Sequence, residues 1–455
     1  MRVSVIKVRD EQFIGKETLN RIGTTVSQLM KLGVSPVIVL DGDSEREQFL
    51  DRTERPFNHY QDSIKKRALK MAAVLEENNP ISSRPVEDLF NMNANGLVLS
   101  SVSAVLNPLS LGIVPVVAPL AYDTQTSEHK IISANDTIQS LVGSLHGNNE
   151  STDRSTVEKI IFIDPVGGIP SVERGGITAS HIFINLEREF SEISSELVLT
   201  NYLPQDIQKL HLKNLQTMKS VLSLLPLTSA GIITTPEVAA LSPNHNRNPI
   251  IYNVLTDRPV TSSSLPVTMK RTPRVQTTIL RKGMTVKTMY SEKGLNLLKE
   301  AKVGNIDLTK LVGLINDSFR KTLDLDHYLN RVNGKVAGII IAGDYEGAAI
   351  ITWEEARGAR VAYLDKFAVK SSSQGGSGVA DIVFKAMMVR MFPREILWRS
   401  RANNPVNKWY FERSKGTQRV PNSHWMMFWN GSDSRETTDL AAYEQICASI
   451  EPSLR

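Results

Sequence analysis

The sequence is poor in the residues that build disulfide frameworks and metal centres. Cys447 is its one cysteine in 455 residues, which excludes a disulfide framework and a cysteine-rich metal site. Its eight histidines do not stand at the spacings of metal ligands, so we expect no metal ion. No hydrophobic run is long enough to cross a bilayer, and we expect no membrane partner. With 41% hydrophobic and 22% charged residues, the composition is that of an ordinary globular protein.

Long runs of one charge are missing as well. The net charge is +5 and the pI is near 9.0, but the basic residues are scattered and have no aromatic residues interleaved among them. We therefore predict no nucleic-acid partner. An anionic ligand or an alkaline compartment accounts equally well for the positive charge. The chain begins almost directly with a hydrophobic strand, and we expect no targeting peptide in it.

Short hydrophobic segments alternate with helical stretches up to about residue 288. Examples are the strands Val3–Ile6 and Pro36–Leu40 and the helix Lys16–Leu32 between them. This alternation predicts an α/β fold with a mostly parallel sheet that helices cover on both faces. Residues 255–274 are rich in Ser, Thr and Pro, and we expect a surface excursion there.

From about residue 295 to residue 455 the pattern predicts a second, mixed α/β domain. A helix is expected at Leu308–Leu323, followed by a β-hairpin whose turn is Gly343–Glu346. A strand at Val361–Val369 then leads through a Ser/Gly-rich loop into an amphipathic helix at Val379–Met391. From Val361 onward a strand, a glycine-rich loop, a helix and a second strand follow one another. This order predicts a chemical function.

Two arginines stand at alternate positions of the strand that begins at Glu395. Because side chains alternate faces along a strand, Arg399 and Arg401 point the same way, about 7 Å apart. Each guanidinium can bind a carboxylate through two hydrogen bonds, so the pair suits a small dianion such as an acidic amino acid. A solvated strand face would show the same pattern, and the arginines alone do not distinguish the two.

The Ser/Gly-rich loop is a candidate phosphate-binding loop. Its glycines let the backbone approach a diphosphate, and the unpaired N–H groups that begin the next helix attract anions. It lacks the Gly-Lys-Ser/Thr ending of nucleotide triphosphatases. A flexible connector would have a similar composition, but the position between a strand and a helix favours binding. The loop consists of Gln374, Gly375, Gly376, Ser377 and Gly378.

In order and spacing these motifs resemble the Gcn5-related N-acetyltransferases. More narrowly, they resemble the N-acetylglutamate synthases, or amino-acid acetyltransferases, of fungi and animals. One departure is visible, because Ser373 stands where the superfamily loop has Gln or Arg, and Gln374 comes one residue late. The resemblance spans most of residues 300–431 and rests on Tyr363–Val369, Gln374–Gly378, Trp398–Arg401, Asn404–Phe411 and Trp425–Trp429.

This resemblance implies acetyl transfer from acetyl-CoA to the α-amine of L-glutamate. Lys366, Arg399 and Arg401 would hold the two carboxylates, and Asn404 would orient substrate or cofactor. Tyr410 would be the general acid for the departing thiolate, since the reference pKa values of a phenol and a thiol differ by only about 1.5 units. The alternative for Tyr410 is a packing role.

The cofactor has its own implied positions. The loop Gln374–Gly378 would hold the CoA pyrophosphate, and backbone N–H groups would stabilise the oxyanion that develops on the thioester. Those N–H groups belong to Phe367, Ala368 and Val369. No residue presents itself as the base that removes the amine proton. A covalent acetyl-enzyme is disfavoured, because Cys447 lies far downstream.

The first part of the sequence is similar to the amino-acid kinase fold, and to acetylglutamate kinase in particular. The similarity is carried by Ala134–Thr137 and Ile160–Ser171. Kinases of this fold follow the first strand with a Gly-Gly turn, where this chain has Arg9 and Asp10. Their side chains would crowd the path of the phosphoryl group and Asp10 would repel it, so we predict no kinase activity. In relatives this domain binds arginine and builds the oligomer, which weakly implicates Gly283 in effector binding.

We therefore predict an N-acetylglutamate synthase in the first step of arginine biosynthesis, inhibited by L-arginine and located in the mitochondrial matrix. Residues 1–288 would form the kinase-like regulatory domain, and residues 295–455 the acetyltransferase domain. The resemblance also implies a homo-oligomer, with a tetramer favoured, and a complex with acetylglutamate kinase. Two alternatives stay open: a bifunctional synthase-kinase, and a non-catalytic, arginine-sensing subunit of an acetylglutamate kinase.

Overall fold

The chain forms two compact units in the computed structural model. The first unit consists of Met1–Thr261 with Lys270–Gly283, and the second of Ser262–Met269 with Met284–Arg455. The second unit thus takes one short segment from between two stretches of the first unit. The structure describes residues 1–44, 57–93, 96–147, 155–172, 176–199, 202–242, 248–256, 259–262, 264–265, 276–374, 378–431 and 440–455.

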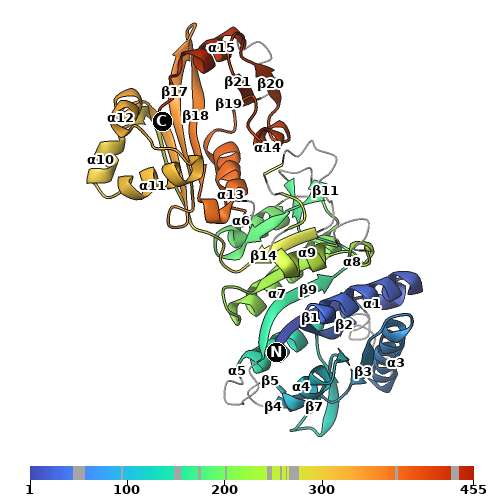
Figure 1. Cartoon of the computed structure of the whole chain (residues 1–455). Helices are drawn as coiled ribbons and strands as arrows, with labels where there is room; N and C mark the ends of the chain where they lie inside the picture. The colour runs from blue at the N-terminus through green and yellow to red at the C-terminus, as the bar shows by residue number, and fades with distance from the viewer. Residues whose placement is uncertain are drawn as a thin grey trace. The chain divides into compact units, whose positions relative to one another are not determined.

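The first unit is built on an eight-stranded sheet in the order β12-β14-β13-β9-β1-β2-β6-β3 (Figure 1). Within the described ranges, every neighbouring pair is parallel except β13 and β14. The predicted mostly parallel sheet is confirmed. Its strands are β1 Arg2–Arg9, β2 Val34–Asp41, β3 Ser82–Val86, β6 Ile113–Val117, β9 Thr156–Ile163, β12 Phe183–Asn185, β13 Ala230–Thr234 and β14 Gln276–Leu280.

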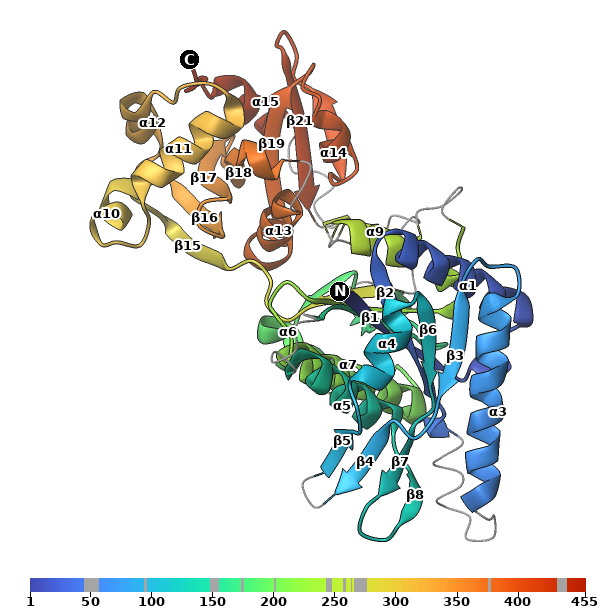
Figure 2. The ribbon, with the colours of Figure 1, turned by 60° about the horizontal axis from the view of Figure 1, so that its bottom comes forward.

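Helices cover both faces of this sheet, as the sequence predicts. Along β1, Val3 and Val5 enter one hydrophobic core while Ile6 and Val8 enter the other, because side chains alternate along a strand. Figure 2 shows α1 and α3 on one side of the sheet and α5 and α7 on the other. The helices are α1 Lys16–Lys31, α3 Phe57–Glu76, α4 Ser103–Ser110, α5 Ala134–Gly147, α6 Leu186–Leu199, α7 Gln205–Ser223, α8 Pro236–Ala239 and α9 Pro249–Thr256.

Two smaller sheets complete the first unit. A four-stranded sheet has the order β5-β4-β7-β8, and β10 pairs with β11. Their strands are β4 Phe90–Asn93, β5 Gly96–Leu99, β7 Leu120–Asp123, β8 Glu128–Ile131, β10 Pro170–Ser171 and β11 Gly176–Ser180, and a short 3-10 helix, η1 Glu11–Phe13, follows β1.

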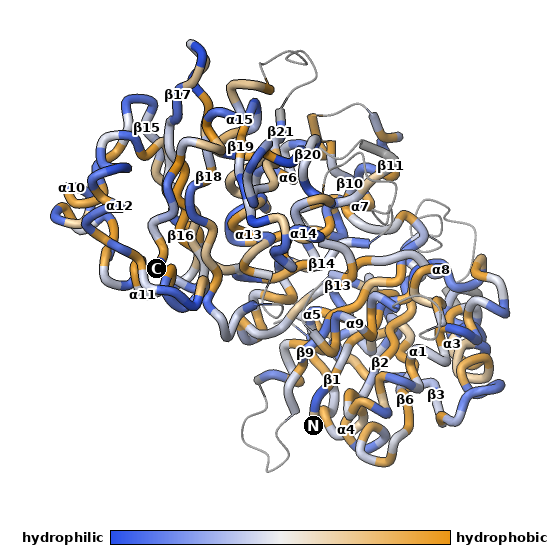
Figure 3. Tube along the Cα trace, turned by 45° about the horizontal axis from the view of Figure 1, so that its top comes forward, coloured by the Kyte–Doolittle hydropathy of each residue, from blue (hydrophilic) through white to orange (hydrophobic). Residues whose placement is uncertain are grey.

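The second unit is a seven-stranded mixed sheet in the order β15-β16-β17-β18-β19-β21-β20. In the described part of the chain its neighbouring strands are antiparallel except β18 and β19. In both units the hydrophobic residues concentrate along the strands (Figure 3). The strands are β15 Val286–Leu295, β16 Val336–Ala342, β17 Gly347–Ala356, β18 Ala359–Val369, β19 Glu395–Arg401, β20 Gly416–Arg419 and β21 Trp425–Gly431.

The helices of the second unit cover both faces of its sheet. One face carries α13 Val379–Lys385, which continues as the π-helix η4 Ala386–Met391. The opposite face carries α10 Leu297–Lys302, α11 Leu308–Phe319, α12 Leu325–Val332 and α15 Leu440–Ser449. Two further short helices are η3 Ser371–Ser373 and α14 Asn407–Phe411.

The second unit corrects several sequence-based expectations. The boundary expected between residues 288 and 295 lies inside β15, which pairs with β16. The predicted helix Leu308–Leu323 is wrong at its end, because Arg320 takes a left-handed conformation (φ 53°) and ends α11. Asp324 caps the next helix by accepting a hydrogen bond from the His327 N–H. The hairpin at Gly343–Glu346 is confirmed by the pairing of β16 with β17.

No helix in the described ranges is long and apolar enough to span a membrane.

We predict that His211 makes the stability of the first unit depend on pH. Burial lowers its pKa to about 4, against about 6.5 in an unfolded chain. Because the folded pKa is the lower one, protonation favours unfolding, and stability falls as the pH drops below about 6.5. We expect a loss of about 2 kcal/mol between pH 7 and pH 5, measured by urea unfolding. His211→Asn should remove that dependence and the exposed-site control His424→Asn should keep it; an unchanged slope in His211→Asn would contradict the prediction.

Candidate functional site

The strand β18 separates early from its parallel neighbour β19. The two strands pair only at Tyr363 with Leu397 and at Leu364 with Trp398, although β18 continues to Val369. On its other edge, β18 pairs with β17 over its whole length, with one bulge. The bulge leaves Asp365 as an extra residue between the partners of Ile350 and Ile351. The backbone of residues 366–369 therefore lies beside a stretch in which β19 does not pair with it.

The predicted site residues of this sheet divide between its two faces. Trp398 and Phe428 belong to the core under α13, together with Tyr410. Leu397 belongs to the core under α15. Arg399 and Arg401 follow Leu397 at alternate positions and therefore share the α15 face. Tyr410 and the two arginines thus lie on opposite faces, close to where β18 and β19 cease to pair.

Arg399 and Arg401 have different surroundings. Arg399 is half-buried, donates hydrogen bonds to the carbonyl oxygens of Cys447 and Ile450, and stacks on the ring of Trp425 at 4.1 Å. Arg401 is exposed. Within the described ranges, neither guanidinium has a carboxylate at ion-pair distance. The described part of the chain therefore leaves the two positive charges on this face without a neutralising carboxylate.

Lys366 lies in a buried ionic cluster on the same face as the arginines. Its Nζ is 2.8 Å from Asp365 Oδ2 and 4.7 Å from the ring centre of Tyr328 on α12. Arg331, also on α12, binds the other oxygen of Asp365 and lies 3.1 Å from Glu354. Burial acts to raise the pKa of Asp365, but the charges of Lys366 and Arg331 outweigh it and hold the pKa below its ordinary value. Two cations and two carboxylates make this cluster neutral.

Tyr410 is buried among aromatic rings. Its ring centre is 5.4 Å from that of Phe428, 5.5 Å from that of Trp409 and 5.8 Å from that of Trp398. Burial raises the pKa of its phenol well above the ordinary value. Full transfer of its proton to a thiolate therefore costs more than the reference pKa values predict. As a neutral phenol, it keeps its capacity to donate a hydrogen bond.

Asn404 follows β19 and lies near Tyr410 in the sequence. Its Nδ2 donates to Ser400 Oγ at 2.8 Å, and its Oδ1 accepts from the Val406 N–H at 3.1 Å. The second bond fixes the turn that leads into α14, the helix that carries Tyr410. Asn404 is half-buried and is held by the turn itself.

The expected cofactor loop is described only at its ends. Gln374 Nε2 donates to the Val369 carbonyl oxygen at 2.9 Å, and the Val369 N–H donates to Ser318 Oγ at 3.0 Å. Of the three backbone positions expected to face the thioester, Val369 therefore already has a partner. Gly378 takes a left-handed conformation (φ 68°) just before α13, as a glycine does without strain. Gly375, Gly376 and Ser377 lie outside the described residues.

Cys447 is buried on α15, the helix that covers the sheet face to which Arg399 and Arg401 belong. Burial raises the pKa of its thiol to about 12, so the thiolate that a nucleophile requires is scarce at neutral pH. The sequence places this cysteine far downstream of the site, whereas the fold brings its carbonyl oxygen against Arg399. A buried thiol of this kind is a poor nucleophile.

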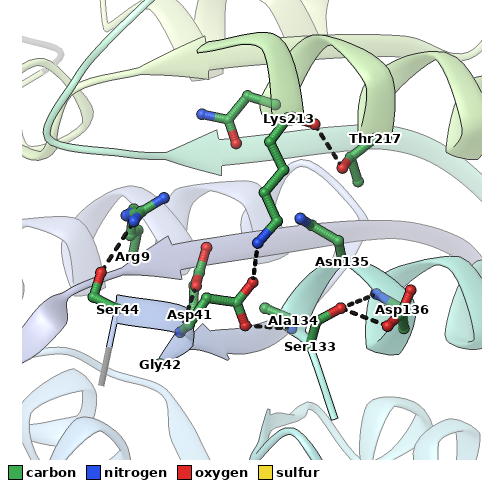
Figure 4. A network of polar contacts seen from close by, with 12 residues as sticks. Arg9, Asp41, Gly42, Ser44, Ser133, Ala134, Asn135, Asp136, Lys213 and Thr217 are labelled. Carbon is green, nitrogen blue, oxygen red and sulfur yellow. Dashed lines mark hydrogen bonds and ion pairs between the residues drawn. The ribbon is translucent and has the colours of Figure 1, made fainter. Parts of the chain in front are cut away.

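A second polar cluster lies where β1, β2 and β9 of the first unit end. Such carboxyl ends of parallel strands are the usual binding edge of an open α/β sheet. Lys7 is buried and lies 3.1 Å from Asp41, and its Nζ donates to Asn135 and Asn214. Asn214 donates to Asp164 at 2.7 Å. Figure 4 shows Arg9, Asp41 and Asn135 near the strand ends, with Lys213 extending toward them from its helix.

This edge carries its own negative charge. Asp43 accepts a hydrogen bond from the Ala134 N–H at the start of α5 and lies 2.8 Å from Lys213. The helix end that would attract a phosphate therefore already has a carboxylate. Asp10 takes a left-handed conformation (φ 50°), and Arg9 pairs with it at 3.3 Å. The cations Lys7, Arg9 and Lys213 are matched by the carboxylates of Asp10, Asp41, Asp43 and Asp164.

Gly283 lies at the end of the first unit. A Cβ at this position would lie 2.7 Å from Nδ2 of the Asn185 side chain, which would have to shift to make room for it. Among the described residues, no three His, Cys, Asp or Glu side chains are grouped so as to hold a metal ion.

Sequence reasoning missed part of the acetyltransferase site. Asp365 stands in the quoted Tyr363–Val369 motif, where a carboxylate inside a hydrophobic strand is a signal of a buried ion pair. Its partner Arg331 lies on a helix that the sequence analysis did not predict. Ser262 and Ser264 lie in the predicted surface excursion, yet both form hydrogen bonds with the buried Arg413. No local pattern indicates that pairing, which spans about one third of the chain.

Comparison with known proteins gives one family and several relatives. A family model described as the N-acetyltransferase of N-acetylglutamate synthase matches residues 293–452. A protein of Yarrowia lipolytica named mitochondrial amino-acid acetyltransferase is 48% identical, over 100% of this chain and 81% of the relative. A protein of Candida dubliniensis with the same name is 37% identical over the same shares.

A solved structure is also similar. It is N-acetylglutamate synthase from Neisseria gonorrhoeae complexed with coenzyme A and N-acetyl-glutamate, at 12% identity, a TM-score of 0.47 and coverage of 94% of both chains. This likeness is too weak to bear on the fold or the function of the chain.

Proposed function

Because the chain belongs to the family of amino-acid acetyltransferases, we propose that it is an N-acetylglutamate synthase, which transfers acetyl from acetyl-CoA to the α-amine of L-glutamate. The observation that supports this best is the arrangement around β18 and β19. Two guanidiniums, for which the described residues provide no carboxylate partner, lie on one face of the sheet, and Tyr410 lies on the other. Two uncompensated positive charges match the two carboxylates of glutamate.

In the proposed reaction the neutral amine nitrogen attacks the thioester carbonyl carbon, the C–S bond breaks, CoA leaves as a thiolate, and the nitrogen releases one proton to the solvent. Arg401 and Arg399 hold the substrate carboxylates. The positive charge of these residues also favours the neutral, reactive form of the bound amine, because a nearby like charge disfavours the ammonium ion. The backbone N–H of Phe367 is the remaining candidate for the oxyanion, because the pairing register directs the Ala368 N–H toward β17.

Lys366 has a narrower role in this proposal than the sequence predicts. Its charge is already shared with Asp365, so it contributes less than either arginine to binding the dianion. Tyr410 on the α13 face donates a hydrogen bond to the sulfur as the C–S bond breaks. Its raised pKa favours this hydrogen bond over complete proton transfer.

Regulation and location rest on the family. We propose that the first unit is a kinase-like domain without kinase activity that binds L-arginine as an inhibitor, and that the protein acts in mitochondria, as the names of its relatives indicate. The matched charges at its strand ends support the loss of phosphoryl transfer, because a triphosphate needs an excess of positive charge. A homo-oligomer, a complex with acetylglutamate kinase and the role of Gly283 are parts of the same proposal.

The direct test is an assay of thiol release from acetyl-CoA with the full chain and a panel of amino acids. We expect release with glutamate, little with glutamine or aspartate, and a lower rate when arginine is added. A second assay with ATP and N-acetylglutamate should show no phosphorylation. Thiol release that is absent from a folded protein would favour the non-catalytic subunit, and phosphorylation would favour the bifunctional enzyme.

Replacing Arg401 should weaken glutamate binding selectively. Arg401→Ala removes one of the two uncompensated guanidiniums, so we expect the KM for glutamate to rise about tenfold or more while the KM for acetyl-CoA stays unchanged. Arg419→Ala is the matched control. This exposed arginine on the neighbouring β20 pairs with Met426 and so faces the opposite side of the sheet from Arg401, which pairs with Trp425. Equal effects of the two variants, or equal effects on both substrates, would contradict the proposed carboxylate contact.

Replacing Tyr410 should slow the chemical step. Tyr410→Phe keeps the ring in its aromatic cluster and removes the donor, and we expect kcat to fall about 100-fold with little change in either KM. Because the phenol stays neutral, the wild-type rate should show no decline near the ordinary tyrosine pKa of about 10. Tyr443→Phe, buried on the opposite face, is the control. A rate equal to wild type would assign Tyr410 to packing alone.

A further inference from the structure

A short segment between two stretches of the first unit is built into the acetyltransferase unit. The chain passes from the first unit into the second at Ser262 and returns to the first at Lys270. Two residues of this passage, Ser262 and Ser264, form hydrogen bonds with residues more than one hundred positions later. We name these two serines the strap.

The strap binds a buried guanidinium. The side chain of Arg413 is only 3% exposed, and its Nε donates to Ser264 Oγ at 2.7 Å while its Nη2 donates to Ser262 Oγ at 2.8 Å. Its other N–H groups reach the Trp409 carbonyl oxygen, Glu412 and Asp381. A guanidinium has five N–H donors, and a buried donor without a partner is costly. The strap supplies two of the partners.

Each serine hydroxyl also connects the guanidinium to a carboxylate. Ser262 Oγ donates to Asp381 Oδ1 at 2.6 Å, and Ser264 Oγ donates to the same oxygen at 2.5 Å. Because each hydroxyl accepts from Arg413 and donates to Asp381, the bonds reinforce one another. Without the hydroxyls, Arg413 and Asp381 would keep one direct contact, at 3.3 Å.

The two ends of this network belong to the elements that carry the proposed site. Asp381 lies in the first turn of α13, the helix that follows the candidate cofactor loop. Arg413 follows α14, donates its backbone N–H to the Tyr410 carbonyl oxygen at 3.0 Å, and stacks on Trp409 at 4.0 Å. Trp409 in turn packs edge-on against Phe384 of α13 at 4.9 Å. The network therefore joins α13, which we call the cofactor helix, to α14, the helix that carries Tyr410.

We propose that Ser262 and Ser264 are positioning residues for acetyl transfer, which act through Arg413 and Asp381 to set the distance between the cofactor helix and Tyr410. The proposal rests on the proposed function. It assigns a role in catalysis to a segment that the sequence assigns to the regulatory domain. An error of about 1 Å in the placement of reacting groups costs about 100-fold in rate, so a partial loosening should be measurable.

The test uses the full chain with both serines replaced. For Ser262→Ala with Ser264→Ala we expect kcat to fall about tenfold and the KM for acetyl-CoA to rise, while the KM for glutamate stays unchanged. Ser262→Thr with Ser264→Thr keeps both hydroxyls and should restore most of the rate. Thr261→Ala, beside the strap, is the matched control and should behave as wild type. Should the double alanine variant fail to fold, each single alanine variant is measured in its place.

Amide hydrogen exchange gives a second readout that does not depend on activity. In the alanine variants we expect faster exchange in residues 379–385 and 407–413, and no change in the threonine or Thr261→Ala variants. An unchanged kcat with unchanged exchange would overturn the proposal, and so would lower thermal stability with an unchanged kcat. If the wild-type protein releases no thiol but the strap variants still loosen both segments, the proposed function fails and the structural connection stands.

Discussion

The second unit depends on the early separation of β18 from β19. Two paired residues on each strand join them, after which the bulge at Asp365 turns the backbone of β18. Continuous pairing would use the N–H of Phe367 inside the sheet, and that group would not remain for a thioester. The same separation lets groups on opposite faces of the sheet act on one molecule. The arginines and Tyr410 would otherwise be divided by a closed layer of backbone.

The cations at the strand ends of the first unit and the two arginines of β19 have partners of different kinds. At the strand ends of the first unit, each cation has a carboxylate partner, and Asp43 lies at the start of α5 where an anion would bind. In the second unit, Arg399 is held by carbonyl oxygens and Arg401 by none of the described carboxylates. Neutral partners fix the position of a guanidinium and leave its charge available to a ligand. This contrast is the physical basis of the glutamate binding and of the lack of phosphoryl transfer that we propose.

The fold could be predicted from the sequence where a regular period controls burial. The alternation along β1, β2 and β9 places each side chain in one of two cores, and the parallel sheet follows from it. Helix ends were less predictable, because the left-handed conformation of Arg320 is set by its surroundings and not by a glycine. The change from α13 to a π-helix at Ala386 has no local signal in the sequence either.

The candidate site was predictable where its residues share one strand or one motif. Arg399 and Arg401 are neighbours on one face by geometry alone, and Asn404 and Tyr410 follow in the same segment. The contacts of Arg399 with the C-terminal residues, and those of Lys366 with α12, depend on packing between distant elements. A pattern of spacing carries no information about such contacts.

The three crossings of the chain between the two units bear on how such a gene can evolve. Recombination at a single point near residue 284 would join a new regulatory half to an acetyltransferase half that had lost its two serines. Only an exchange that preserves residues 262–269 would leave the guanidinium of Arg413 with all of its acceptors. Each unit has hydrophobic cores of its own, yet the acceptors of Arg413 come from both sides of such a junction.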